Sequence, residues 1–206
     1  MTDPDWAALD AAWEPARRAG VLGTATTEAL IAHAAGFLPA ACRVGDRFSG
    51  IDLGTGAGVP GIVLAALRPA SSWVLVDASE RRCEYAATAV RALGLGSRVR
   101  VVHARAETVA HDPEFRARQD LVVARSFGPP TELAECALPL VAPDGVLVVS
   151  VTEGTRGEWS RAADVVGIRF VDEHAIEAGF LGVRPPTEVP AAWPRRPAAR
   201  RRSPLF

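Results

Sequence analysis

The 206-residue sequence contains no lysine, and all 23 of its basic residues are arginine. This absence excludes lysine-dependent chemistry such as a Schiff base or the phosphate-binding lysine of a P-loop. The three cysteines, Cys42, Cys83 and Cys136, lie far apart and form no CxxC pair, which argues against a disulfide framework or a zinc site. The histidines share no metal-ligand spacing with each other or with the cysteines, so we expect no bound metal.

Long apolar runs are also missing. The sequence is 49% hydrophobic, yet charged residues and glycines break every apolar stretch before the roughly 18 positions that a membrane span needs. The opening residues, MTDPDWAALD, lack the apolar core of a signal peptide. We therefore expect a cytoplasmic protein with no membrane partner, and the length favours a single domain.

The charge is balanced overall but unevenly placed. The formal net charge is -1, and five arginines crowd into eight residues near the C-terminus: Arg195, Arg196, Arg200, Arg201 and Arg202. Subtracting these five positive charges leaves -6 on the rest of the chain. Contact with a polyanion is therefore expected at this cluster rather than over the whole surface.

The order of apolar segments predicts an α/β fold. Two helices, expected over residues 4–18 (with Asp3 as N-cap and Pro4 in the first turn) and 26–41, come before strands that alternate with helices. The segments expected to form strands are FSGIDL, WVLVDA, VRVVHA, DLVVA (120–124) and GVLVVSV (145–151), and residues 168–183 are expected to form two weaker strands. Strands separated by helices indicate a mostly parallel, seven-stranded sheet with helices on both faces. The proline-rich residues from 185 onward are expected to be extended.

The strongest local motif is IDLGTGAGVPG, in which a strand ends at Asp52 and turns through Gly54, Gly56 and Gly58 into a helix. Glycines allow the sharp turn and the close approach of a ligand to the backbone. Nicotinamide and flavin enzymes use a related G-x-G-x-x-G loop, so an oxidoreductase remains an alternative. The G-x-G-x-G spacing and the acid that closes the strand favour S-adenosylmethionine over a dinucleotide, whose pyrophosphate needs an open helix N-terminus.

Asp77 closes the next expected strand, 19 residues after Gly58. In Rossmann-like folds an acidic side chain at this place accepts hydrogen bonds from ribose hydroxyls. The alternative is that Asp77 only caps the helix that follows it.

Several motifs together resemble the glucose-inhibited division protein B family, which methylates guanine in small-subunit rRNA: DLGTGAGVPGIVLA, VDASERR, HARAE, VVARSF and WPRRPAARRRSPLF. The resemblance covers about residues 48–151 and the extreme C-terminus. It implies a single Rossmann-like class I methyltransferase domain, 1–206, with a helical prelude (1–45), a Rossmann-like core (46–184) and a basic Pro/Arg tail (185–206). It also implies S-adenosylmethionine as methyl donor, 7-methylguanosine as product, and 16S rRNA or the small ribosomal subunit as partner of a monomeric enzyme.

The same resemblance assigns site residues. It places Gly54 and Val59 against the cofactor, Ala106 and Glu107 at its adenine end, and Arg125 at the border of the cofactor and the substrate cleft. Independently, ligands of open parallel sheets lie at the carboxyl ends of the strands, where Asp52, Asp77, Glu107 and Arg125 all fall. Phe127 follows the fourth strand and could stack on a base or belong to the core.

Methylation of guanine N7 requires no catalytic base, because this nitrogen carries a lone pair and no proton. The absence of a Ser/His/Asp or Cys/His arrangement therefore agrees with this reaction, and no catalytic acid or base is assigned. Two other functions of the same fold stay open: a small-molecule methyltransferase, and a non-catalytic S-adenosylmethionine-binding partner of the ribosome.

The two ends of the chain depart from the family pattern. The segment LGTATTEALIAHAAGFLPA differs from the usual substrate-binding region; its His33 is interpreted either as a substrate contact or, more commonly for such a residue, as a partly buried helix histidine. Arg200 and Arg201 stand where small residues and lysine are expected. The five tail arginines are nevertheless candidate phosphate contacts, because each guanidinium can pair with a phosphate in two-point geometry.

Overall fold

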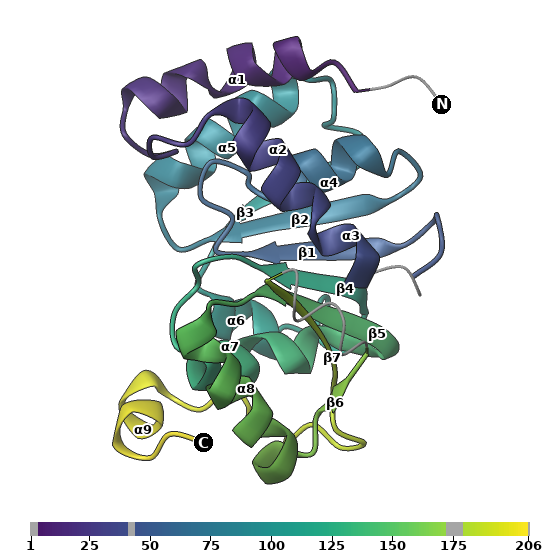
Figure 1. The fold of residues 1–206 in the computed structure, drawn as a ribbon, viewed down its shortest axis with the longest axis vertical. Helices are drawn as coiled ribbons and strands as arrows, with labels where there is room; N and C mark the ends of the chain where they lie inside the picture. Colours follow the sequence, from purple (N-terminus) through teal and green to yellow (C-terminus); the bar gives the residue numbers. More distant parts are fainter. Residues whose placement is uncertain (1–3, 41–43, 172–178, 206) are drawn as a thin grey trace.

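The computed structural model describes residues 4–40, 44–171 and 179–205 (Figure 1). Its α-helices are α1 (Trp6–Arg18), α2 (Thr27–Ala35), α3 (Phe37–Ala40), α4 (Gly61–Leu67), α5 (Glu80–Ala92), α6 (Ala106–His111), α7 (Pro130–Ala137), α8 (Glu153–Val166) and α9 (Pro197–Arg202). A short 3₁₀ helix, η1 (Leu138–Leu140), follows α7. The strands are β1 (Ser49–Leu53), β2 (Ser72–Asp77), β3 (Val99–His103), β4 (Gln119–Ala124), β5 (Val141–Ser150), β6 (Arg169–Phe170) and β7 (Phe180–Arg184).

The seven strands form one sheet in the order β3-β2-β1-β4-β5-β7-β6. Strands β1 to β5 run parallel, whereas β7 lies antiparallel between β5 and β6. The order reverses beside β1, since the chain runs outward to β3 and then returns to β4 on the other side. The predicted α/β class and mostly parallel seven-stranded sheet are confirmed. Such a reversal is the usual ligand-binding place of an open parallel sheet.

Helices cover both faces of the sheet, so the domain has three layers (Figure 1). One core lies under α1, α2, α4 and α5 and includes Trp13, Phe37 and Trp73. The other lies under α6, α7 and α8 and includes Leu138 and Trp159. Successive side chains of β4 point to opposite faces of the sheet. Leu121 and Val123 therefore pack in the first core, and Val122 and Ala124 pack in the second.

The N-terminal helices differ in detail from the prediction. Helix α1 begins at Trp6 because the Asp5 side chain accepts a hydrogen bond from the Ala8 amide at 2.9 Å. The predicted cap, Asp3, lies outside the described residues. The predicted helix 26–41 is interrupted at Gly36, where a Cβ would come within 2.2 Å of the Phe180 ring. This close approach joins the N-terminal region to β7.

The C-terminal segment also corrects the prediction. Residues 197–202 form helix α9 instead of continuing as an extended tail. The preceding Trp193 is buried in the second core, and its carbonyl accepts a hydrogen bond from Arg116 at 2.8 Å. The segment is therefore packed onto the domain rather than free.

No helix in the described ranges has both the length and the apolar composition that crossing a membrane requires. Within the same ranges, the His, Cys, Asp and Glu side chains form no group of three or more that could hold a metal ion.

Candidate functional site

The glycine loop after β1 has the backbone conformation that glycine allows. Gly54, Gly56 and Gly58 have φ values of 72°, 59° and 100°, all in the region that side-chain-bearing residues rarely adopt. The amides of Gly54 and Thr55 both donate to the Val76 carbonyl, at 2.8 and 3.0 Å. These bonds fix the loop against the end of β2.

Asp52 supports this loop from below. Its side chain is 0% exposed, and its Oδ2 accepts hydrogen bonds from the Thr55 hydroxyl at 2.6 Å and the Gly61 amide at 2.9 Å. The carboxylate thus holds both ends of the turn and does not line the cavity described below, so the contact between Asp52 and the cofactor stays a prediction. Burial raises the pKa of Asp52 to about 6, in spite of these hydrogen bonds.

The raised pKa of Asp52 predicts a specific pH dependence of stability. The folded protein binds this proton more tightly than the unfolded chain, so the contribution of Asp52 to stability falls as pH rises from about 4 to about 6. Asp52→Asn keeps an acceptor oxygen and should remove this fall, which amounts to at most about 3 kcal/mol. Urea unfolding of both proteins at several pH values measures it. Identical pH profiles would contradict the assignment.

A cavity of about 260 Å³ opens above the loop at the carboxyl ends of β1, β2, β3 and β4. Four of the predicted cofactor residues line it: Gly54, Asp77, Ala106 and Glu107. The predicted cleft residue Phe127 also lines it, with its ring packed over Gly54. The structure thus brings together residues from four strand ends, as the parallel topology predicts.

Asp77 is the acidic group of this cavity. Its side chain is 5% exposed; Oδ2 accepts from the Gly56 amide and Oδ1 from the Ser79 amide, both at 2.9 Å. The cap of α5 is the Ser79 side chain, which accepts from Arg82. Asp77 therefore joins the loop to the cavity, and each carboxylate oxygen keeps a further lone pair for a ligand.

The remaining predicted cofactor residues lie beside the cavity rather than in its lining. The Gly56 amide is bonded to Asp77, and Gly58 and Val59 are buried under the loop. A Cβ at Gly58 would come within 2.3 Å of Ile62, so this glycine is required by helix packing. These three residues shape the loop.

Arg125 follows β4 and is half-buried, and it forms no hydrogen bond or ion pair with any described residue. Strand alternation places it on the same face of the sheet as Leu121 and Val123, which is the face that α2 covers. Burial lowers the pKa of Arg125, while the charge of Asp52 opposes this shift. The guanidinium is thus a half-buried cation without a described protein partner, which suits an anionic or carbonyl ligand.

His33 lies on α2 in an aromatic cluster. Its ring is 5.8 Å from Phe37 and 5.1 Å from Phe180, and its buried Nε2 has no hydrogen-bond partner among the described residues. Burial and, secondarily, the charge of Arg125 lower the pKa of His33. The neutral imidazole is therefore favoured near the Arg125 side of the site.

The tail arginines do not act as one exposed cluster. Arg195 forms an ion pair with Glu135, and Arg200, only 5% exposed, pairs with Glu107 and Glu132. Arg196, Arg201 and Arg202 are exposed. The prediction of five phosphate contacts stays a prediction, and the charges of Arg195 and Arg200 are already paired within the chain.

Four residues important to the site are not predicted from the sequence, although one of them, Thr55, lies inside the glycine motif. Glu132 and Glu135 on α7 hold the tail arginines, and Thr55 holds Asp52. The Trp13 indole donates to the Ala57 carbonyl at 3.0 Å, so helix α1 supports the glycine loop. All but Thr55 act over long sequence separations, which local patterns cannot reveal.

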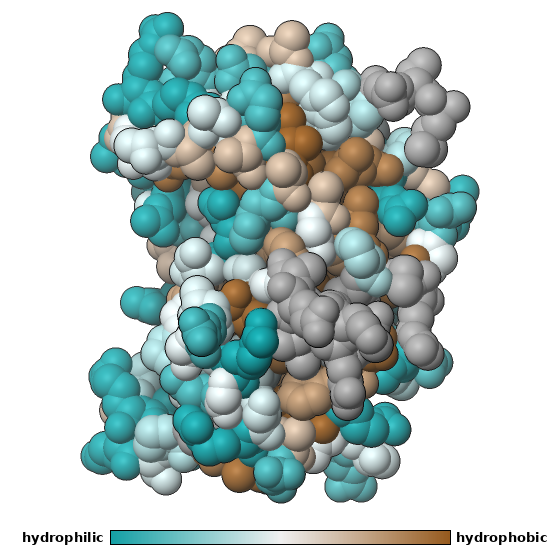
Figure 2. Space-filling view, viewed as in Figure 1, coloured by the Kyte–Doolittle hydropathy of each residue, from teal (hydrophilic) through white to brown (hydrophobic). Residues whose placement is uncertain are grey.

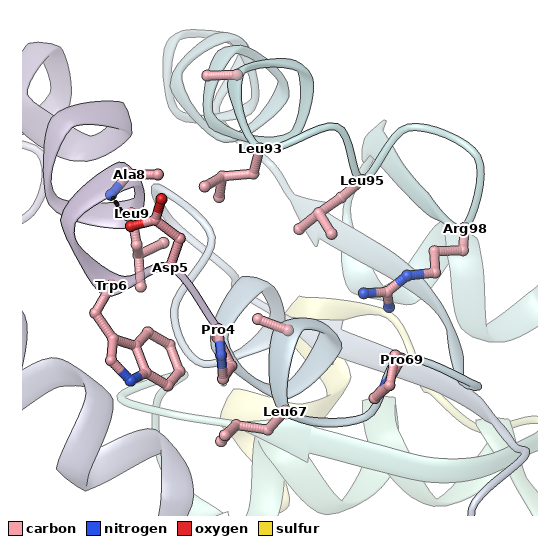
Figure 3. A pocket seen from close by; sticks show the side chains of 12 residues that line it. Pro4, Asp5, Trp6, Ala8, Leu9, Leu67, Pro69, Leu93, Leu95 and Arg98 are labelled. Atoms are coloured by element: carbon pink, nitrogen blue, oxygen red, sulfur yellow. Dashed lines mark hydrogen bonds between the residues drawn. The ribbon is translucent and has the colours of Figure 1, made fainter. Parts of the chain in front are cut away.

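A larger cavity, about 610 Å³, lies elsewhere (Figure 3). Side chains of α1 converge there with Leu67, Leu93 and Leu95, and Arg98 points in from the start of β3. This cavity is mostly apolar and opens near the amino ends of the strands. Ligands of parallel sheets bind at the opposite edge, so the smaller cavity is the candidate site.

Gly54 provides a direct test of the cavity wall. In Gly54→Ala the new methyl group would lie 3.2 Å from the Phe127 ring at a φ of 72°. We expect a loss of stability of about 1–2 kcal/mol from the backbone alone, together with weaker cofactor binding. Gly20→Ala is the matched control, because Gly20 has a φ of 69° and a Cβ there meets nothing within 4 Å. Both variants should lose stability in thermal unfolding, but calorimetry should show weaker cofactor binding only for Gly54→Ala; equal cofactor affinity of the two variants would contradict the role of Gly54.

The residues of the cavity fit S-adenosylmethionine. An acidic side chain for ribose hydroxyls, glycine backbone at the cavity wall and an aromatic ring lie together at the strand ends where Rossmann-like folds bind nucleosides. A Cβ at Gly54 would narrow this space, as expected of a close-approach position.

Comparisons with known proteins place the chain in a family. A family model described as GidB, rRNA small subunit methyltransferase G, matches residues 23–178. The Ribosomal RNA small subunit methyltransferase G of Deinococcus deserti is 37% identical over 168 residues, covering 76% of this chain and 68% of the relative. That of Salinispora arenicola is 41% identical over 147 residues, covering 68% and 59%.

Among solved structures, a protein from Corynebacterium glutamicum superposes with a TM-score of 0.58 at 20% identity, covering 92% of this chain and 94% of that one. At this identity the likeness concerns the fold alone. The family model and the sequence relatives show more: the chain belongs to the GidB family, rRNA small subunit methyltransferase G, whose members are S-adenosylmethionine-dependent methyltransferases.

Proposed function

We propose that this protein transfers the methyl group of S-adenosylmethionine to N7 of a guanine in 16S rRNA. The observation that carries the proposal is the cavity of Gly54, Asp77 and Phe127 at the strand ends, in a chain that the family model matches from residue 23 to 178. We further propose that the enzyme is monomeric and cytoplasmic and that its substrate is the small subunit or its naked RNA.

The residues of the site meet the needs of this reaction. The bound cofactor supplies an electrophilic methyl group, and guanine N7 needs no deprotonation, so the protein has to orient the two and exclude water. Asp77 orients the cofactor through its ribose. Phe127 covers the cavity beside Gly54, where an aromatic face can support a base. Arg125 offers two-point hydrogen bonding to the carboxylate of the cofactor, or a hydrogen bond to guanine O6 that leaves N7 free.

The exposed tail arginines provide a surface for RNA phosphates. Three tail arginines are exposed: Arg196, Arg201 and Arg202. They are close in sequence to Arg200, which lines the cavity. Figure 2 shows mostly hydrophilic residues over the corner where Figure 1 places α9. A phosphate held there would be close to the mouth of the cofactor cavity.

Replacing Arg196, Arg201 and Arg202 together with Gln should lower RNA affinity and reduce the slope of log affinity against log salt by about 2–3. The matched control replaces three exposed arginines on α5, α8 and β6: Arg91, Arg161 and Arg169. Filter binding of 16S rRNA at several salt concentrations measures both variants. An equal slope in the two triple variants would contradict a specific role of the tail.

The proposed reaction is tested by calorimetric titration of S-adenosylmethionine, followed by transfer of labelled methyl to small subunits and to extracted rRNA that lack the modification. Binding together with label on guanine N7 supports the proposal. Binding without transfer to either RNA would overturn the acceptor, and no binding would overturn the cofactor site.

A further inference from the structure

Residues 190–202, here named the C-terminal strap, are fastened to α6, α7 and the turn that follows α6. Arg116 donates to the carbonyls of Trp193 and Pro190, at 2.8 and 3.0 Å, and His111 Nε2 lies 3.0 Å from the Pro194 carbonyl. The buried Trp193 anchors the segment in the core below the sheet. The strap thus has a fixed course across one side of the cofactor cavity.

Two inward arginines neutralise the acidic side of α6 and α7. Arg195 Nε lies 3.0 Å from both oxygens of Glu135, whose side chain is 1% exposed. Arg200 Nη2 donates to Glu107 at 2.5 Å and to Glu132 at 3.1 Å. Because both carboxylates bind one nitrogen, removal of Arg200 would leave two like charges side by side.

The Arg200 contacts belong to the cofactor cavity itself. Arg200, Glu107 and Glu132 all line it, together with Asp77 and Phe127. Burial by itself would raise the pKa of Glu107, but the hydrogen bond and charge of Arg200 outweigh this effect and the pKa is lowered. Glu107 is therefore ionised and held in place by a residue 93 positions away in the chain.

The inner side of the C-terminal strap faces the cofactor cavity, and its outer side faces solvent, where RNA would bind. Arg200 points into the cavity wall at 5% exposure, whereas its neighbours Arg201 and Arg202 and the nearby Arg196 are exposed. A segment held on its outer side by RNA phosphates would hold Arg200 against Glu107 more firmly. Coupling of this kind is reciprocal, so bound cofactor would also favour RNA binding.

We propose that the C-terminal strap couples cofactor binding to RNA binding, with Arg200 as the positioning residue that completes the cofactor cavity. This inference rests on the proposed function, because it takes rRNA as the ligand of the outer face. It assigns Arg200 to the cofactor side of the enzyme and Arg196, Arg201 and Arg202 to the RNA side.

The test is equilibrium dialysis of labelled S-adenosylhomocysteine, which binds without reacting, in the presence and absence of unmodified small ribosomal subunits. For the wild-type chain, subunits should tighten the binding of S-adenosylhomocysteine at least fivefold. Arg200→Gln should weaken binding at least tenfold without subunits and lose the tightening. The variant that carries Arg196→Gln, Arg201→Gln and Arg202→Gln should keep the wild-type affinity for S-adenosylhomocysteine without subunits and should also lose the tightening by subunits.

A structural defect alone would lower the affinity without changing the ratio measured with and without subunits, so this ratio identifies coupling. If Arg200→Gln does not fold, the variant that also carries Glu132→Gln removes one of the two unpaired carboxylates, leaves Glu107 in the cavity and is measured instead. Wild-type affinity in the Arg200 variant, or no tightening of the wild type by subunits, would overturn the inference. Failure of the wild type to bind S-adenosylhomocysteine at all would instead overturn the proposed function and the inference with it.

Discussion

Asp77→Ala is expected to lower the affinity for S-adenosylmethionine by about 100-fold or more. A carboxylate that accepts hydrogen bonds from two ribose hydroxyls contributes about 1.5–3 kcal/mol for each bond. The same change removes the acceptors of the Gly56 and Ser79 amides, so the glycine loop loses one of its attachments to β2 and keeps those at the Val76 carbonyl. Calorimetric titration measures the affinity directly.

Asp77→Asn separates these two contributions. Asparagine keeps an acceptor oxygen of similar size for the Gly56 amide but carries no charge. Its NH2 group faces the Ser79 amide, which loses its acceptor, so the melting temperature should fall moderately, while the cofactor affinity should lie between those of the wild type and Asp77→Ala. If Asp77→Ala bound the cofactor normally, the ribose role would be wrong and Asp77 would only hold the loop.

Arg125→Gln is expected to lower kcat/KM for methyl transfer by about 10²–10³-fold. Two charge-assisted hydrogen bonds from one guanidinium correspond to about 3–4 kcal/mol, and each 1.4 kcal/mol is a tenfold change. No described residue pairs with Arg125, so the protein itself should lose little stability. Steady-state kinetics and thermal unfolding of the same samples test both statements.

The kinetic constants identify which ligand Arg125 binds. A higher KM for S-adenosylmethionine indicates the carboxylate of the cofactor, and a higher KM for RNA indicates the guanine. Arg125→Lys keeps the charge without the two-point geometry and should show an intermediate loss. A large fall in melting temperature with unchanged kinetics would make Arg125 a structural residue.

The cofactor side of the site could be predicted from short stretches of sequence. Gly54 and Gly58 have positive φ values, and a Cβ at either would crowd a neighbouring side chain. Only glycine meets these conditions without strain, so the motif predicts the backbone conformation directly. Asp77 closes a strand that runs parallel to β1, and parallel strands bring their carboxyl ends to one edge. Such local requirements are visible in any window that contains the motif.

The role of Asp52 shows where this reasoning ends. The sequence places an acid at the end of β1, but only the fold shows that its Oδ2 points to Thr55 and Gly61. The direction of the Asp52 side chain decides whether this residue faces the cavity or supports the glycine loop beneath it.

The sequence by itself determined the alternating α/β pattern, the glycine loop and the acid of the second strand, because each depends on the conformation of a few neighbouring residues. The tertiary structure decided the roles of the arginines. Arg200 and Arg201 are adjacent and chemically identical, yet one is 5% exposed against Glu107 and the other faces solvent. Their difference arises from the docking of the C-terminal strap on α6 and α7, a contact between segments far apart in the chain that no local pattern encodes.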